Sequence, residues 1–377
     1  MNSSFFSEML QSIADRGRAL IARREPARER SAGLIEACEA LLSGRGEASG
    51  VALASDILAR YATLTIGPRV AFFEALETTF GYDRPRIDAA IAGWRESPTP
   101  ASAAELHRAS EPRRLELFRR LNLAPGGTAA LVRMREQLLD AMQHREDLVA
   151  IDTDFIHLFT SWFNRGFLEL RRIDWQTPAA VLEKLIAYEA VHEIKDWDDL
   201  RRRLAADRRC FAFFHPALPG EPLIFVEVAL VEGLATAVPP LLSQDTDEAA
   251  ARARAARADT AIFYSISNCQ GGLRGVSFGN FLIKQVVEEL GAEFPQLKRF
   301  STLSPVPGFR RWLTQHREEG DDAGAGLLRD IASDDWCHDP AQREVLRPVL
   351  MRLCARYLTR RPSIGIDPVA GSWLTGR

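Results

Sequence analysis

The stretch Ala261-Ile-Phe-Tyr-Ser-Ile-Ser267, with the glycines that follow it, decides the fold of the C-terminal part of the chain. This run is rich in β-branched and aromatic residues, which is typical of a buried strand. Four glycines come next, and after them Phe300-Ser-Thr-Leu303 resumes an extended pattern. Between these segments an apolar residue recurs every fourth position, which predicts an amphipathic helix, at Phe278, Leu282, Val286 and Leu290. Strand, glycine-rich loop, helix and strand in this order indicate an α/β unit.

The segments on either side of this unit extend the same pattern. Residues 211–214 and 223–230 are short apolar runs bounded by Pro and Gly, which predicts two further strands. The charged, alanine-rich residues 245–259 indicate a solvated helix or a surface excursion. A last helix is predicted after Asp339, with Asp339 as its cap and Pro340 in its first turn.

The first 150 residues have almost no strand pattern and predict helices joined by short polar loops. One apolar stripe at helical spacing consists of Leu131, Met134, Leu138 and Met142. Residues 44–50 and 96–100 are predicted loops, with Ser102 as the cap of the following helix. The sequence therefore predicts an α + α/β protein, with an all-helical bundle at 1–150 and an α/β domain at 151–377.

Composition narrows the classes of function. The 377 residues are 46% hydrophobic and 26% charged, and the net charge of −3 provides no general positive field for a nucleic acid or an anionic membrane. No stretch is apolar enough to span a bilayer, and no signal or transit peptide is recognisable. The five cysteines are widely spaced, which favours a reducing compartment. The final residues, Thr375-Gly-Arg377, are not a peroxisomal signal, so we expect a cytoplasmic protein.

The glycine-rich loop from Gly271 to Ser277 is the strongest candidate for ligand binding. Backbone N–H groups exposed before a helix suit a phosphate or pyrophosphate, and Arg274 and Lys284 would assist. The loop matches neither common nucleotide-binding motif, so a tight turn without a ligand remains an alternative on spacing alone. The hydroxyls of Ser301, Thr302 and Ser304 lie at the end of the last predicted strand and in the loop after it. They could relay a proton, although a serine there is often only a cap or turn residue.

Other kinds of site are less well supported. The seven histidines form no metal-binding motif, and the Asp334–Asp339 patch is interpreted as a polar loop, so no metal is expected. A serine-hydrolase Gly-x-Ser-x-Gly motif is absent. His215 lies in the link between two predicted strands, where a partly exposed histidine of a hairpin connection is the simplest interpretation.

Several long segments in the same order resemble the malonyl-CoA decarboxylase family. They cover most of the chain and are most similar between about residues 150 and 315. These segments are Trp162-Phe-Asn-Arg-Gly-Phe-Leu168, Tyr188-Glu-Ala-Val-His192, Phe214-His-Pro-Ala-Leu-Pro-Gly-Glu-Pro222, Gln270-Gly-Gly-Leu-Arg-Gly275 and Phe300-Ser-Thr-Leu-Ser-Pro-Val-Pro-Gly-Phe309.

The resemblance implies an N-terminal helical domain used for self-association and a C-terminal acetyltransferase-like (GNAT) domain. It implies decarboxylation of malonyl-CoA to acetyl-CoA and CO2 through a thioester enolate, without a metal, biotin or another prosthetic group. It places catalysis on Ser301. It places substrate binding on Ser301 and on the loop residues Gly271, Gly272, Leu273, Arg274, Gly275, Val276 and Ser277.

One departure from the family pattern concerns the C-terminus. The family has a histidine in a segment resembling Asp-Pro-Val-Ala-x-Phe-His, whereas this chain has Asp367-Pro-Val-Ala370 followed by Gly371-Ser-Trp-Leu-Thr-Gly-Arg377. We therefore expect a member that is truncated or diverged after Ala370. Two alternatives to an active lyase stay open: a CoA-thioester-binding protein without turnover, and an acyl-CoA N-acyltransferase with Glu227 as the base.

Overall fold

The computed structural model describes residues 27–44, 47–243, 247–276, 281–306, 308–316, 331, 336 and 339–360. The chain forms two compact units. The first extends to Trp162 and also includes the short segment Gly271–Leu273. The second contains Phe163–Gln270 and the chain from Arg274 onward. A short piece of the glycine-rich loop thus belongs to the helical unit and not to the sheet that precedes it in the sequence.

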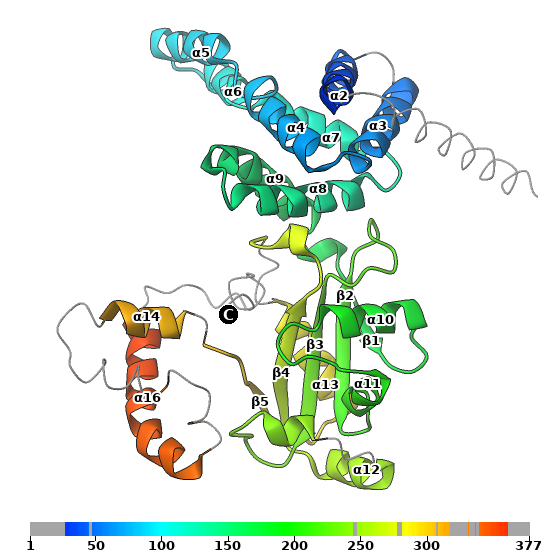
Figure 1. The fold of residues 1–377 in the computed structure, drawn as a ribbon, viewed down its shortest axis with the longest axis vertical. Helices are drawn as coiled ribbons and strands as arrows, with labels where there is room; N and C mark the ends of the chain where they lie inside the picture. The colour runs from blue at the N-terminus through cyan, green and yellow to red at the C-terminus, as the bar shows by residue number, and fades with distance from the viewer. Residues whose placement is uncertain are drawn as a thin grey trace, which may run out of the picture. The chain divides into compact units, whose positions relative to one another are not determined.

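The first unit is helical in all its described residues apart from the connections, as predicted (Figure 1). Leu131, Met134 and Leu138 of the predicted stripe are fully buried, so this face of the helix forms part of the core. The helices are α2 (Ala27–Leu42), α3 (Glu47–Ala62), α4 (Ile66–Thr78), α5 (Arg84–Glu96), α6 (Pro100–Ala109), α7 (Arg113–Asn122), α8 (Gly127–Met142), the 3-10 turn η1 (Glu146–Leu148) and α9 (Val149–Trp162).

Two helix starts differ from the prediction. Helix α3 begins at Glu47, inside the predicted loop 44–50. The cap of α6 is Thr99 and not Ser102: the Thr99 side chain accepts from the Ser102 amide, and the Ser102 hydroxyl accepts from the Thr99 amide. The error arises because Ser102 occupies the N3 position of a reciprocal capping box, a role more often filled by Glu or Gln.

The second unit is built on a five-stranded sheet in the order β1-β2-β3-β4-β5. The first three pairings are antiparallel, and β4 and β5 are parallel. The strands are β1 (Glu169–Ile173), β2 (Arg208–Phe214), β3 (Ile224–Val231), β4 (Thr260–Asn268) and β5 (Arg299–Thr302). Strands β2 to β5 confirm the prediction. Strand β1 was missed because its sequence, Glu-Leu-Arg-Arg-Ile, is mostly charged, as an edge strand tolerates.

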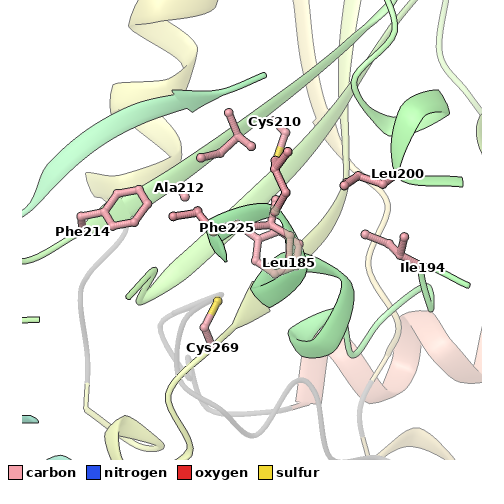
Figure 2. Packing of buried hydrophobic residues seen from close by; sticks show 11 residues of the cluster. Leu185, Ile194, Leu200, Cys210, Ala212, Phe214, Phe225 and Cys269 are labelled. Atoms are coloured by element: carbon pink, nitrogen blue, oxygen red, sulfur yellow. The ribbon is translucent and has the colours of Figure 1, made fainter. Parts of the chain in front are cut away.

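Helices cover both faces of the sheet. Helices α10 (Ala179–Tyr188) and α11 (Trp197–Arg203) contribute Leu185 and Leu200 to an apolar cluster with strand residues such as Cys210 and Phe225 (Figure 2). Helix α13 (Phe281–Glu293) belongs to the opposite face. Its last residue, Glu293, accepts from Arg172 of β1 and Arg209 of β2. The predicted helix between β4 and β5 is thus confirmed.

An irregularity in the pairing of β3 with β4 redirects the side chains of β4. Glu227 pairs with Ser265, but the next residue, Val228, pairs with Phe263, which leaves Tyr264 as an extra residue. Such a bulge interrupts the alternation of side chains. As a result Tyr264, which packs in a cluster with Ile262, and Ser265, which bonds Glu189 after α10, lie on the same face of the sheet.

The remaining described elements are η3 (Pro239–Leu242), α12 (Glu248–Arg257), α14 (Phe309–His316) and α16 (Pro340–Arg360). Asp339 accepts a hydrogen bond from the Ala341 amide, which confirms the predicted cap of the last helix. Helix α12 is the predicted solvated helix, and only its alanines Ala251 and Ala255 are buried. Among the described residues, no helix combines the length and the hydropathy that crossing a membrane requires.

Candidate functional site

The glycine-rich loop begins where β4 ends. The Asn268 side chain accepts a hydrogen bond from the Gln270 amide at 3.0 Å, and the Gln270 side chain donates to the Pro222 carbonyl. The chain then forms the 3-10 turn η4 (Gly271–Leu273), and Gly275 has a φ of 81°, a left-handed conformation that favours glycine. Val276 is fully buried. The predicted binding residue Ser277 lies outside the described residues.

Helix α8 packs directly against this loop. A Cβ atom on Gly272 would lie 1.9 Å from the carbonyl oxygen of Val132, far inside contact distance. A Cβ atom on Gly271 would lie 2.4 Å from a carboxylate oxygen of Glu136, whose flexible side chain can move away. Glycine is therefore required at position 272, because two backbone segments approach each other closely.

A buried cation fixes the loop to the same helix. Arg135 of α8 is 1% exposed, and its Nη1 donates to the Gly272 carbonyl at 2.7 Å. Its Nε donates to the Asp152 carboxylate of α9 at 2.7 Å. The guanidinium thus has a carboxylate partner that offsets its desolvation, and its orientation is set by two short bonds. The loop is held in a fixed conformation by Arg135, which lies 137 positions earlier in the sequence, a contact that periodicity could not predict.

Ser301, the predicted catalytic residue, lies on β5. It is half-buried and pairs with Ile262 in the parallel register. Two residues further on, Leu303 packs against the cluster that contains Ile262 and Tyr264. Alternate residues of an extended chain point to the same side, so Ser301 lies on the face of the sheet that carries Tyr264.

The parallel strands separate just beyond Ser301. The Leu303 amide still donates to the Phe263 carbonyl at 2.8 Å, which is the last bond of the pairing. Strand β4 continues to Asn268, whereas the chain after β5 leaves the sheet with Ser304 exposed. Carboxyl ends of neighbouring parallel strands are a usual position for ligand sites. In the segment after β5, Pro307 lies outside the described residues.

His215 follows β2 in the connection to β3. Its Nδ1 accepts from the Ala217 amide at 3.1 Å, and its ring contacts that of Phe163 at a centroid distance of 4.8 Å. Strands β2 and β3 pair antiparallel on either side of it. The interpretation of this segment as a hairpin-type connection is confirmed.

Sequence reasoning missed a buried polar cluster on the face of the sheet that carries Ser301. Glu227 is fully buried and accepts from Arg203 at 2.6 Å. Beside it, Glu189 accepts from the hydroxyls of Ser265 and Ser267 at 2.8 and 2.9 Å. Within the described part of the chain, the second oxygen of Glu227 and the Tyr264 hydroxyl have no hydrogen-bond partner other than each other. The one signal that sequence offered was a glutamate within the apolar run 223–230.

Burial raises the pKa of Glu227 to about 8, and the nearby Glu189 carboxylate adds to the rise, against the opposing effect of Arg203. The side chain therefore holds its proton at neutral pH. Glu227 is also fully buried, so an amine substrate could not reach its carboxyl group directly. This burial speaks against Glu227 as the base of an acyltransferase.

This raised pKa makes stability depend on pH. Between pH 4.5 and about 8 the folded chain holds a proton on Glu227 that the unfolded chain has released. The contribution of this proton to the free energy of unfolding is fully present below pH 4.5 and is lost as the pH rises through about 8. Glu227→Gln cannot lose this proton, so we expect the variant to be more stable than the parent at pH 9, on the order of 2 kcal/mol. Urea unfolding at pH 5, 7 and 9 measures the difference.

The matched control for this prediction is Glu248→Gln, which removes an exposed carboxylate paired with Arg252 on α12. Its free energy of unfolding should follow that of the parent at each pH. If Glu227→Gln and the parent lost stability equally between pH 5 and 9, Glu227 would not be the titrating group.

The described residues contain no group of three or more His, Cys, Asp or Glu side chains placed to hold a metal ion. The Asp334–Asp339 patch falls largely outside the described residues, as do the residues from 361 onward, where the family's histidine segment would lie. Cys38, Cys210 and Cys269 are buried and reduced, and burial raises the pKa of each thiol.

Comparison with known proteins identifies the family. The family model for the malonyl-CoA decarboxylase C-terminal domain matches residues 166–375, and that for the malonyl-CoA decarboxylase N-terminal domain matches residues 80–163. The chain belongs to the malonyl-CoA decarboxylase family. Within this family, a crystal structure of malonyl-CoA decarboxylase from Rhodopseudomonas palustris is 50% identical, covers 91% of this chain and 84% of that one, and superposes with a TM-score of 0.83.

Three further relatives show how far the similarity extends. The malonyl-CoA decarboxylase structure from Agrobacterium vitis is 52% identical, covers 86% of this chain and 80% of its own, and has a TM-score of 0.77. The mitochondrial malonyl-CoA decarboxylase of Mus musculus is 34% identical over 80% of this chain and 68% of its own length. The chain spans 57% of the goose (Anser anser anser) relative, at 36% identity over 69% of this chain.

Proposed function

We propose that this chain decarboxylates malonyl-CoA to acetyl-CoA and CO2. The observation that carries the proposal is its membership of the malonyl-CoA decarboxylase family, at 50% identity to a bacterial decarboxylase over 91% of the chain. The positions that the resemblance assigns to substrate and catalysis are the glycine-rich loop after β4 and Ser301 on the parallel strand β5.

The proposed reaction uses the thioester of the substrate as the electron sink. Cleavage of the bond between C2 and the carboxylate releases CO2, and its electron pair moves onto the thioester oxygen to form an enolate. Backbone N–H donors near that oxygen would stabilise the developing charge, and one such donor contributes about 3–4 kcal/mol. A proton then adds to C2 and gives acetyl-CoA. No metal or prosthetic group is needed for this sequence of steps.

We assign the CoA-binding role to residues 271–277 and the proton-relay role to Ser301. The turn η4 is supported by Arg135, so its backbone N–H groups can be presented to an anionic ligand in a fixed geometry. Ser301 is half-buried at the strand end, where its hydroxyl can reach a bound substrate while most of β4 stays in the core. A serine hydroxyl at such a position suits proton transfer when an acid lies nearby.

The first test is the release of CO2 and acetyl-CoA from malonyl-CoA by the full chain, next to a variant with a family-type tail. In the alignment Asp367-Pro-Val-Ala370 with the family's Asp-Pro-Val-Ala-x-Phe-His, positions 372 and 373 correspond to Phe and His. The variant is therefore Ser372→Phe with Trp373→His. Isothermal titration with coenzyme A, in parallel, measures binding without turnover.

Turnover by the parent chain supports the proposal and means that a group other than the family's histidine supplies the proton. Turnover only in the variant means that the chain is a decarboxylase scaffold lacking its acid, and CoA binding by the parent then favours the CoA-thioester-binding alternative. No turnover in either protein, with transfer of an acetyl group to an amine, would contradict the proposal in favour of an N-acyltransferase.

We also propose that the chain self-associates through its helical part, residues 1–150, and that it acts in the cytoplasm. The support for self-association is the family resemblance, and the support for the compartment is the composition and the reduced, buried cysteines. Sedimentation velocity of the full chain at several concentrations tests the first point. A single monomeric species at all concentrations would contradict it.

A further inference from the structure

A pocket of about 340 Å³ lies at the end of β3, bordered by η3 and α12. Arginine dominates its polar lining: Arg202, Arg208, Arg254 and Arg257 are present beside the carboxylates of Asp207 and Glu232. Val231 at this end of the sheet pairs with Thr260, the first residue of β4. The pocket therefore lies at the end of β4 opposite to Asn268, after which the glycine-rich loop begins.

The most buried charges of this pocket do not balance. Arg202 donates to both oxygens of Asp207, at 2.6 and 3.1 Å, and forms a bidentate pair. Asp207 is 1% exposed, and these contacts hold its pKa below the usual range despite its burial. This pair accounts for one positive and one negative charge.

Arg208 brings a second positive charge to the same place. It is 4% exposed, and its two terminal nitrogens donate to the carbonyls of Asp207 and Leu241, at 2.9 and 2.7 Å. Its only carboxylate contact among the described residues is Asp207, at 3.2 Å, which Arg202 already occupies. Its Nε is buried and has no hydrogen-bond partner in the described part of the chain. A buried cation without a carboxylate of its own is unfavourable unless an anion lies nearby.

We propose that this pocket binds the phosphate group of a small metabolite. Guanidinium groups match the geometry of a tetrahedral oxyanion and donate several hydrogen bonds to it. A volume of about 340 Å³ is near the lower limit of small-molecule sites, so it fits a small phosphorylated compound better than a nucleotide. The shared chemistry is a phosphate oxyanion, supplied either as free phosphate or as a phosphate monoester.

Two charged residues of opposite sign at the rim of the pocket can be neutralised one at a time, while the buried arginines stay unchanged. Arg257 and Glu232 both line the pocket and form an exposed pair at 2.8 Å. Arg257→Gln removes a positive charge and should weaken phosphate binding about fivefold, whereas Glu232→Gln removes a negative charge and should strengthen it by about the same factor. The control is Arg252→Gln, on the same helix α12 but outside the pocket lining, which should leave the affinity unchanged.

The measurement is isothermal titration of the full chain with inorganic phosphate and with glycerol 3-phosphate, at constant ionic strength, once without coenzyme A and once with coenzyme A at saturation. In the proposed function coenzyme A binds at the glycine-rich loop, so phosphate binding that persists with coenzyme A present reports a separate site. Tighter binding of glycerol 3-phosphate than of phosphate identifies a monoester as the ligand, and equal binding identifies free phosphate.

Three results would overturn the proposal: no saturable binding by the parent chain, loss of binding when coenzyme A is present, or the same affinity in all four proteins. None of these results depends on whether the chain decarboxylates malonyl-CoA. Failure of this inference is therefore distinguishable from failure of the proposed function.

Discussion

Replacing Ser301 by alanine is expected to lower kcat for malonyl-CoA decarboxylation by about 10²–10⁴-fold, the usual contribution of a group that transfers a proton. The effect follows if the Ser301 hydroxyl takes part in protonation of C2 of the enolate. Since Ser301 is only half-buried, the loss of its hydroxyl should change the free energy of unfolding by less than about 0.5 kcal/mol. Steady-state rates and urea unfolding of the same preparation separate the two effects.

Ser304→Ala is the matched control, because Ser304 is an exposed serine of the segment that follows β5. It should retain the rate of the parent chain. If Ser301→Ala also retained that rate in a preparation active with malonyl-CoA, the proton-relay role of Ser301 would be wrong. In a preparation where only the Trp373→His, Ser372→Phe variant is active, the substitution is made in that background.

The second large effect is expected from Gly272→Ala. The added methyl group would lie 1.9 Å from the Val132 carbonyl oxygen, and backbone cannot move aside as a side chain can. Helix α8 and the loop must then separate, which disturbs the bond from Arg135 to the Gly272 carbonyl. We expect a loss of about 1–3 kcal/mol in stability and a weaker affinity for coenzyme A. Urea unfolding and titration with coenzyme A measure these two quantities.

Gly291→Ala provides the control for this substitution. Gly291 lies within helix α13, and nothing lies within 4 Å of the position of its added methyl group. An alanine there should stabilise the helix by about 0.5–1 kcal/mol and leave coenzyme A binding unchanged. Equal stability and equal affinity of Gly272→Ala and the parent chain would show that the close contact with α8 does not constrain the loop.

The order of the elements was predictable because the strongest signals are local. Strands β2, β3 and β4 are apolar runs between Pro and Gly, and the helix after the loop has a clear period of four. The edge strand β1 was not predictable, since its exposed side chains are charged. The bulge at Tyr264 was not predictable either, because it depends on the register with β3 and not on the residues of β4 alone.

The candidate site was predictable only in part. Glycine spacing indicated the loop, and family resemblance indicated Ser301, but neither could show what holds the loop. The Arg135–Gly272 bond joins positions 137 residues apart, and the pairing of Glu227 with Arg203 joins a strand to a helix. Such contacts appear only when the chain is folded. The glutamate within the apolar run 223–230 was the sequence signal for the second pair, and the structure shows that its side chain is fully buried and bonded to Arg203.

The place of η4 in the helical unit limits how the gene can be divided or recombined. A fragment that starts at Phe163 would carry Gly271–Leu273 without the helix that Gly272 touches, and a fragment that ends at Trp162 would lack the Gly272 backbone that packs against Val132. A hybrid enzyme should therefore take α8 and the loop from the same parent. Val132, Arg135 and Gly272 must remain compatible with one another, although more than a hundred codons separate Gly272 from the other two.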